Sequence, residues 1–556
     1  MNDSTHTAMI GSRPTESADL RELGEEVWRW RAQQQPCSRD DIPRIERPVG
    51  WLPSWSEASV SAWRSDLEGF ERRWAEIDTA PLSTSDVVDY HLVSSALSRV
   101  RWELDHVEGW RRNPSFHLDQ AVGVVFDLLL PPPPFDDDRT DELLRAIQTI
   151  PERLEQGRSC LDGHAAAPFA DIAREELRHA ERDMAEFAAG LVEVLPDSAH
   201  GQIRGSATEA GRALGGFRDW LRDSRGHSDP GFSVGRESFE FFLREVALWP
   251  YSPEDMLEIG RREFQRSIAF ERWAMNRHRG VSVPALPDGI HELVQRQRAD
   301  EQRVRDFYVD GRWLSQPSQL RHYLFAEKPR YMAALEFLGA VSTDHTSPSR
   351  LHRNGTAYTR PPTEGMPYFF DSGARDPRTA IVHEGVHYQQ LALSYGHPNP
   401  LRRHYYDSGP NEGIAFYNEE WMLQAGLFDD EPWSEIVIYN MVRLRALRVE
   451  VDVRLSIDDM DIVSAARYLI EAVPLDRETA EEEAHMFAST PGQGLTYQIG
   501  KSELIRMQAD AILADPEGFS LQDFHDYVWM NGNVPFSLQR LELLDDASDL
   551  AALGKL

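Results

Sequence analysis

The feature that most constrains this chain is a pair of histidines four residues apart, His383 and His387, with Glu384 directly after the first. On an α-helix, residues i and i+4 lie on one face, so both imidazoles can reach a single metal ion only if this stretch is helical. Glu384 lies about 100° around the helix from His383, where it can approach a metal-bound water without being a ligand. This is the HExxH pattern of zinc-dependent hydrolases. The stretch therefore predicts a helix that carries part of a zinc site.

The residues around this pattern favour a helix and supply a third ligand. Asp376 and Pro377 form a typical helix start, and Gly396 is a typical helix end. A second helix start follows near Ser408, and Glu412 lies in its first turn. A connecting loop of about a dozen residues allows the two helices to pack side by side. Two histidines and one glutamate leave the fourth position of one Zn²⁺ ion open, which is the arrangement of a catalytic zinc site.

Segments of the C-terminal half resemble a known bacterial family. Residues 412–419 read EGIAFYNE and residues 491–500 read PGQGLTYQIG. They are similar to the EGWAxYxE and PGQALSYxIG segments of the bacterial domain of unknown function numbered 885, and residues 524–526 and 532–535 fit its closing segment. Family members often carry a Pro-Gly insertion inside the histidine motif, which this chain lacks. The spacing from His387 to Glu412 also resembles that of gluzincin zinc peptidases of the angiotensin-converting-enzyme and thimet-oligopeptidase kind.

These resemblances and the helical patterns together imply a mainly α fold. The expected architecture is a large, gluzincin-like body of many helices around a deep cleft, with a small β element before the metal helix. Residues 17–350 are expected to form the helical N-terminal part of the shell, and residues 351–556 the part that carries the zinc site, as one compact body. Residues 1–16 are polar and rich in Ser and Thr, and are predicted to be disordered. The family's activity is poorly defined, so the resemblance bears on fold and metal more than on substrate.

Composition excludes several classes of protein. The net charge of −33 disfavours nucleic acids and anionic membranes as partners, because both would be repelled. No run approaches the roughly 18 apolar residues that cross a bilayer. The two cysteines are too few for a disulfide framework, and residues 1–24 lack the apolar core of a signal peptide. We expect a soluble, cytoplasmic protein, and its oligomeric state is left open.

The residue types in the motif predict hydrolysis by an activated water. A zinc ion held by the two histidines and Glu412 lowers the pKa of its bound water from about 15.7 toward about 7. Glu384 can take the proton as the water attacks a carbonyl, and can deliver it to the departing amine. The oxyanion that forms needs a further donor. Tyr497 is the leading candidate, because related gluzincins place a tyrosine at this point of the chain; the other candidates, His404, Tyr405 and Tyr406, lie between the two metal helices.

Other residues are candidates for supporting the site. Glu419 follows Glu412 by two helical turns, so it can accept a hydrogen bond from a metal-bound histidine or pair with an arginine. Arg448 and Asp452, four residues apart, resemble an Arg and Asp pair of the bacterial family. Lys501 can pair with the terminal carboxylate of a substrate, although a solvated position is equally compatible with the pattern.

A segment before the motif is interpreted as extended. Between Gly355 and Gly373, aromatic residues are set among Thr, Pro and Gly. In zinc peptidases an edge strand beside the metal helix binds an extended substrate through backbone hydrogen bonds. We therefore assign substrate binding, as a hypothesis, to the segment that contains Met366, Tyr368 and Phe369. An ordinary core strand is the alternative.

Three functions are compatible with these observations. The first is a zinc metallopeptidase that cleaves short peptides. The second is a zinc hydrolase that uses the same residues on a non-peptide amide or ester. The third is a catalytically silent helical binding protein in which the HExxH pattern has arisen by chance or is a relic.

Overall fold

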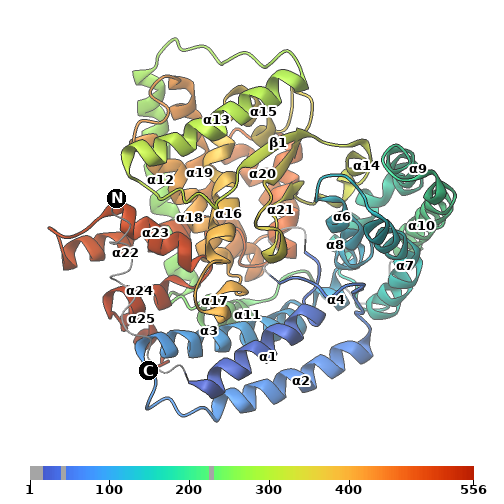
Figure 1. Cartoon of the computed structure of the whole chain (residues 1–556), viewed down its shortest axis with the longest axis horizontal. Helices are drawn as coiled ribbons and strands as arrows, with labels where there is room; N and C mark the ends of the chain where they lie inside the picture. The colour runs from blue at the N-terminus through green and yellow to red at the C-terminus, as the bar shows by residue number, and fades with distance from the viewer. Residues whose placement is uncertain (1–16, 39–44, 224–230) are drawn as a thin grey trace.

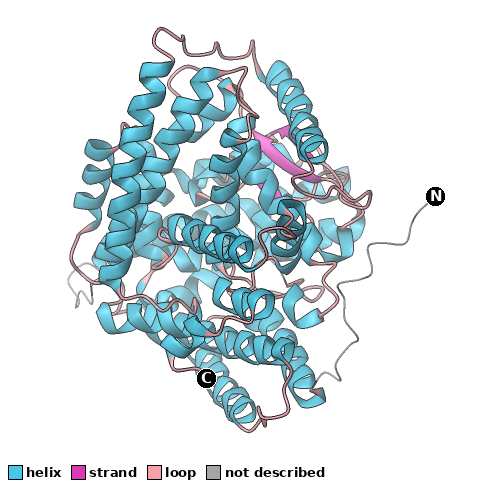
Figure 2. Ribbon diagram, turned by 90° about the vertical axis from the view of Figure 1, so that its left-hand side faces the viewer, coloured by secondary structure: helices cyan, strands magenta, loops and turns pink. Residues whose placement is uncertain are grey.

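The computed structural model describes residues 17–38, 45–223 and 231–556. The disorder predicted for residues 1–16 lies outside these ranges. The fold is mainly α-helical with one small sheet, as the sequence predicted (Figures 1 and 2). Amphipathic periodicity explains this result, because most of the long helices bury one face and expose the other.

The first half of the chain is helical up to residue 311. Its α-helices are α1 Ala18–Gln34, α2 Glu57–Ala75, α3 Thr84–Arg101, α4 Gly109–Arg112, α5 Pro114–Leu118, α6 Val124–Leu129, α7 Asp137–Leu161, α8 Ala167–Glu176, α9 Ala180–Leu191, α10 Asp197–Asp223, α11 Arg236–Phe241, α12 Pro253–Arg277 and α13 Ile290–Gly311. Within the described residues, three short segments are π-helical, namely η1 Trp102–Val107, η2 Asp119–Gly123 and η4 Phe242–Val246. The segment η3 Leu177–His179 is a 3₁₀-helix.

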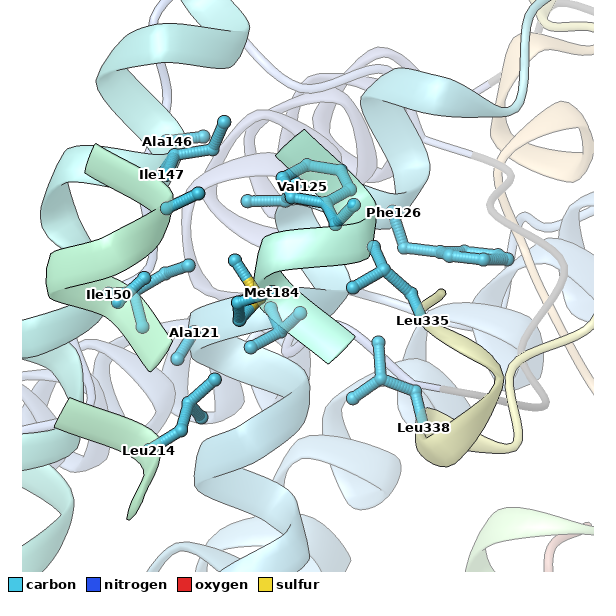
Figure 3. Packing of buried hydrophobic residues seen from close by; sticks show 14 of the residues in the cluster. Ala121, Val125, Phe126, Ala146, Ile147, Ile150, Met184, Leu214, Leu335 and Leu338 are labelled. Atoms are coloured by element: carbon cyan, nitrogen blue, oxygen red, sulfur yellow. The ribbon is translucent and has the colours of Figure 1, made fainter. Parts of the chain in front are cut away.

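One hydrophobic core belongs to α6, α7, α9 and α10, which lie together at the right of Figure 1. Ile147 and Ile150 of α7 share one helix face, and Met184 of α9 and Leu214 of α10 pack in the same cluster (Figure 3). All four side chains are fully buried. Burial of a side chain of this size stabilises the fold by about 1.5–3 kcal/mol. Leu335 and Tyr358 also belong to this cluster, and because Tyr358 lies within residues 351–556, these helices are packed against the part that carries the motif.

A three-stranded sheet precedes the metal helix. Its strands are β1 Tyr323–Glu327, β2 Thr343–Asp344 and β3 Gly355–Thr359, in the order β1-β3-β2. Strand β1 runs parallel to β3, with Tyr323 opposite Gly355, and β2 runs antiparallel to β3, with Thr343 opposite Ala357. The predicted β element is therefore present, and β2 is its short edge strand.

The extended structure predicted for residues 366–370 is wrong from Tyr368 onward. Residues Tyr368–Arg375 form helix α15, and only the start of the predicted region is a strand. The backbone N–H of Tyr368 donates to Asp476, and Ser372, Gly373 and Ala374 are buried. Aromatic residues favour strands only weakly, and packing against the following helix overrides that preference.

The remaining helices surround the motif. They are α14 Arg330–Ala333, α16 Arg378–Ser394, α17 Pro400–Arg403, α18 Ser408–Gln424, α19 Pro432–Ser456, α20 Ile462–Ala472, α21 Arg477–Ser489, α22 Thr496–Ala514, α23 Leu521–Asn531, α24 Phe536–Leu544 and α25 Ser548–Leu553, with 3₁₀ turns η5 Glu336–Leu338 and η6 Pro348–Arg350. Helices α16 and α18 lie near the centre of the molecule and contact each other, and α22 packs against α18 (Figure 1).

Candidate metal centre

His383, His387 and Glu412 meet at one point between α16 and α18. The Nε2 atoms of the two histidines are 3.3 Å apart, and Glu412 Oε2 lies 3.3 Å from His383 Nε2 and 3.5 Å from His387 Nε2. Ligand atoms held about 2.0–2.1 Å from a tetrahedral zinc ion are about 3.3–3.4 Å apart. The three side chains therefore have the mutual spacing of three corners of a zinc tetrahedron. Glu412 Oε2 has no hydrogen-bond partner within the described part of the chain, which fits an atom that binds a metal.

Local packing brings the two helices to this distance. Asn418 of α18 donates from Nδ2 to the backbone oxygen of Val382 in α16, at 2.7 Å. On its other side α18 crosses α22 so closely that a Cβ atom on Gly413 would lie 2.6 Å from the carbonyl carbon of Gly500. Only glycine fits at such a crossing. These glycines fix the position of α18, and with it the carboxylate of Glu412.

The electrostatic environment of the cluster favours positive charge. Burial alone would lower the pKa of His383, but the adjacent carboxylates of Glu412 and Glu419 outweigh it and raise this pKa to about 9. Burial would raise the pKa of Glu412, but the two histidines hold it well below its usual range. An environment that attracts a proton this strongly also attracts a divalent cation.

Glu419 stands behind His383 in the position that the sequence predicted. Its Oε1 lies 2.7 Å from Nδ1 of His383, and the carboxylate is fully buried. The same oxygen lies 2.8 Å from Nη2 of Arg445 on α19, a residue that the sequence analysis did not single out. A carboxylate in this place fixes the tautomer and the ring orientation of a metal-binding histidine. Arg445 compensates its buried charge.

Glu384 faces a cavity of about 1710 Å³ that also reaches the three ligand side chains. The carboxylate is half-buried, so it is accessible from this space. Typical small-molecule sites enclose about 300–1,000 Å³. The cavity therefore has room for a ligand larger than a single amino acid.

Tyr497 lines the cavity beside His383, with the two rings stacked at a centroid distance of 6.0 Å. The guanidinium group of Arg448 also lies over the tyrosine ring, 4.4 Å from its centroid. The predicted pair of Arg448 with Asp452 does not form. Arg448 makes a two-bond ion pair with Glu483, because α21 packs against that face of α19.

Asp452 instead holds the loop that leads to Tyr497. Its carboxylate accepts hydrogen bonds from the backbone N–H groups of Gly492 and Leu495, at 2.9 and 3.0 Å, and from the hydroxyl of Ser456. Burial raises the pKa of Asp452 to about 7 although these donors lower it. Its role in the structure is to fix the loop before Tyr497.

The structure separates the predicted substrate residues into two groups. Among the described residues that line the cavity are Met366 and Phe369, but not Tyr368, His404, Tyr406 or Lys501. The hydroxyl of Tyr368 donates to Asn440 at 2.7 Å, and His404 packs against the edge of Trp28. Tyr406 is buried away from the cavity, as is its neighbour Tyr405, whose hydroxyl contacts Ser95.

Lys501 is also buried, and its Nζ lies 2.8 Å from Glu420 Oε2. The prediction that this ammonium group binds a substrate carboxylate is therefore wrong in this structure. Helix α22 turns Lys501 toward α18, where Glu420 neutralises it, rather than toward the cavity.

His345 is a cavity residue that the sequence analysis missed. It directly follows β2, its ring lies 6.5 Å from that of His387, and its buried Nε2 has no hydrogen-bond partner within the described ranges. Burial, followed by repulsion from His387, lowers the pKa of His345 to about 3, so the ring is neutral. The next residue, Thr346, has a φ of +68°, which is strained for a β-branched residue. Neither feature leaves a periodic signal in the sequence.

The backbone around His345 is anchored. The carboxylate of Asp344 receives two hydrogen bonds from Arg350, at 2.7 and 2.8 Å, and one from the backbone N–H of Thr346 at 3.0 Å. Strained backbone persists where the surroundings fix it and occurs often at functional sites. The imidazole of His345 is therefore held in a defined position opposite the metal helices.

Comparison with known proteins gives a family and a fold. A family model described as bacterial protein of unknown function (DUF885) matches residues 46–542. No curated protein matches the chain. A protein from Colwellia psychrerythraea, provisionally described as a lipoprotein, has a similar structure, with a TM-score of 0.71, 15% identity, and coverage of 94% of this chain and 97% of that chain. A lipoprotein of unknown function from Shewanella oneidensis, also provisionally described, gives a TM-score of 0.67 with 16% identity over 95% and 97% of the two chains. At these identities the likeness establishes the fold alone.

Proposed function

This chain belongs to DUF885, a bacterial family of unknown function, and we propose that it is a zinc metallopeptidase that cleaves short peptides. The observation that carries the proposal is the spacing of 3.3–3.5 Å between the three ligand atoms of His383, His387 and Glu412. The cluster opens onto a cavity beside Glu384. The gluzincin-like arrangement around a deep cleft is part of the same proposal.

The residues of the chain have separate roles in this proposal. Zinc bound at the cluster would activate a water molecule and polarise the substrate carbonyl. Glu384, half-buried at the cavity, takes the proton of the attacking water and passes it to the leaving nitrogen. Tyr497 and His345 line the same cavity, and each can donate a hydrogen bond to the oxyanion.

The shape of the site supports a short peptide as the substrate. Strand β2 is one of the two edge strands of the sheet, and its Thr343 lines the cavity, as does His345. An extended peptide can add to such an edge through backbone hydrogen bonds. A cavity of about 1710 Å³ accommodates a short peptide, and the helices around it exclude a folded protein.

Two further parts of the proposal concern partners and location. The net charge of −33 disfavours nucleic acid as a partner. Across the described ranges, none of the helices has both the length and the apolar character that crossing a membrane requires. A cytoplasmic location stays a prediction. The two solved structures with a similar fold are described as lipoproteins.

The proposal is tested by incubation of the zinc-loaded protein with a mixture of oligopeptides and analysis by mass spectrometry. We expect cleavage by the wild type, and loss of cleavage with retained zinc in Glu384→Gln. If peptides stay intact while acylated amino acids or small esters are hydrolysed, the chain is a zinc hydrolase of another substrate class. If the purified protein binds no zinc, the catalytically silent binding protein replaces the proposal.

A further inference from the structure

We infer that the cavity contains a specificity subsite beside the N-terminal end of α18, where Gln493 binds a peptide unit of the substrate and an adjacent apolar pocket takes a large apolar side chain. The inference rests on the proposed function and adds the class of peptide that the site selects. Three observations support the inference: the loop that carries Gln493 is held in place, the amide nitrogen of Gln493 has no partner within the described residues, and an apolar pocket adjoins the loop.

The loop that carries Gln493 is rigid. Gly492 and Leu495, on either side of it, both donate backbone hydrogen bonds to the buried carboxylate of Asp452. Gly492 has a φ of +93°, and a Cβ atom there would lie 2.4 Å from the ring of Phe242. Only glycine combines this backbone conformation with this contact. The position of Gln493 is therefore fixed before any substrate binds.

The side-chain amide nitrogen of Gln493 lacks a hydrogen-bond partner within the described residues. Gln493 lines the cavity, and its Nε2 is buried without a partner in the part of the chain that the structure describes. Buried polar groups are almost always hydrogen-bonded, and an unpaired one is costly. A glutamine amide offers both a donor and an acceptor, as a peptide unit does. A peptide in the cavity supplies the missing partner.

This amide lies close to the metal cluster. The hydroxyl of Thr496 donates to the backbone oxygen of Gln493 at 2.5 Å and lies 3.1 Å from the hydroxyl of Ser408. Ser408 begins α18, and Glu412 follows about 6 Å further along the helix axis. A residue bound at Gln493 is therefore a near neighbour of the bond that is cleaved.

An apolar pocket adjoins the loop. Trp102 and Phe242 belong to the π-helical segments η1 and η4, and their rings are 5.2 Å apart. Half-buried Val107 and Phe116 line the cavity in the same region. π-Helical turns inside α-helices occur often at functional sites. These residues present an apolar surface to a substrate side chain.

Two charged groups near the pocket, Arg99 and Glu103, are neutralised within the protein. Arg99 lies 3.0 Å from the carboxylate of Asp407, and Glu103 pairs with Arg31. A charged substrate side chain would therefore lose hydration without gaining a free counter-ion. The subsite selects residues such as Phe and Leu over Asp, Lys and Gly.

The test uses pentapeptides of the form Ala-Ala-Xaa-Ala-Ala, in which Xaa is Gly, Ala, Asp, Lys, Leu or Phe. We expect the wild type to prefer Phe or Leu over Gly by at least about tenfold in kcat/KM. Gln493→Leu should raise KM about tenfold, equivalent to about 1.4 kcal/mol, with little change in kcat. Gln302→Leu, the same change on an exposed face of α13, should leave both constants unchanged. Val107→Phe should fill the pocket and shift the preference toward Ala.

The outcomes separate the subsite from the proposed function. Folding of each variant is verified by urea unfolding and zinc content. Cleavage by the wild type with an unchanged KM in Gln493→Leu, or without preference for large apolar residues, overturns the subsite alone. Peptide binding is measured separately by calorimetry with the zinc-loaded Glu384→Gln protein. If this protein binds none of the pentapeptides and the wild type cleaves none, both the subsite and the peptidase function are overturned.

Discussion

The contact between Glu419 and His383 offers the sharpest test of how the fold supports the metal cluster. Glu419 is fully buried, 2.7 Å from the histidine and 2.8 Å from Arg445. In Glu419→Gln the histidine loses a charged acceptor, and loss of such a partner weakens metal binding about 10–100-fold. This corresponds to about 1.4–2.7 kcal/mol of zinc-binding free energy. The same variant leaves Arg445 buried without a counter-ion, which costs about 3–5 kcal/mol of folding free energy.

A second variant separates the two effects. In the double variant Glu419→Gln/Arg445→Met the unpaired charge is removed, so the unfolding free energy should recover most of its loss while zinc affinity stays low. Glu435→Gln is the matched control, because Glu435 lies 2.6 Å from Nε2 of His278 and does not line the cavity. It should leave zinc affinity unchanged.

Zinc affinity is measured by competition with a chromophoric chelator, and stability by urea unfolding of the metal-free protein. If Glu419→Gln binds zinc as tightly as the wild type, Glu419 has no part in metal binding and this reasoning is refuted. A double variant that regains zinc affinity together with stability would show that the single variant loses zinc only because it unfolds.

Three further predictions follow from the site and its helices. Glu384→Gln should keep one zinc ion per chain and lower turnover by about 10²–10⁴-fold, measured by metal analysis and peptide assay; an unchanged rate would exclude Glu384 as the base. Because the pKa of His383 in the metal-free protein is raised to about 9, its contribution to stability is complete below pH 6.5 and is lost as the pH rises through 9. Urea unfolding of chelated protein should show a decrease of about 3 kcal/mol across this window, and His383→Gln should abolish it. Gly413→Ala should lower the unfolding free energy by about 1–3 kcal/mol and weaken zinc binding, because its Cβ collides with α22, whereas Gly205→Ala, in open space on α10, should not destabilise the protein.

Local spacing was enough to predict the centre of the site. His383 and His387 share a helix face at i and i+4, and Glu412 and Glu419 are two turns apart on the next helix, so their relation depends only on helical periodicity. The structure also explains why each of the two family-like segments has a glycine at this point. Gly413 and Gly500 are in contact where α18 crosses α22, and a larger residue would not fit there. The mainly α fold and the small β element are confirmed.

Helical periodicity did not predict the side-chain contacts between helices that are distant in the sequence. Arg448 and Asp452 are also four residues apart, but they do not pair. Arg448 forms an ion pair with Glu483 of α21, and Asp452 accepts a hydrogen bond from the loop before Tyr497. Lys501 faces Glu420 because of the angle at which α22 crosses α18, which no local pattern encodes. His345 follows a strand of two residues, too short for a periodic signal.

X-ray absorption spectroscopy at the zinc edge tests the central claim most directly, when combined with metal analysis of the purified protein. The account predicts one zinc ion per chain with two imidazole nitrogens and oxygen ligands at about 2.0–2.1 Å. His383→Ala and Glu412→Ala should each lose the ion or alter this spectrum. Zinc bound in full, with an unchanged spectrum, in both variants would contradict the assignment of the metal site.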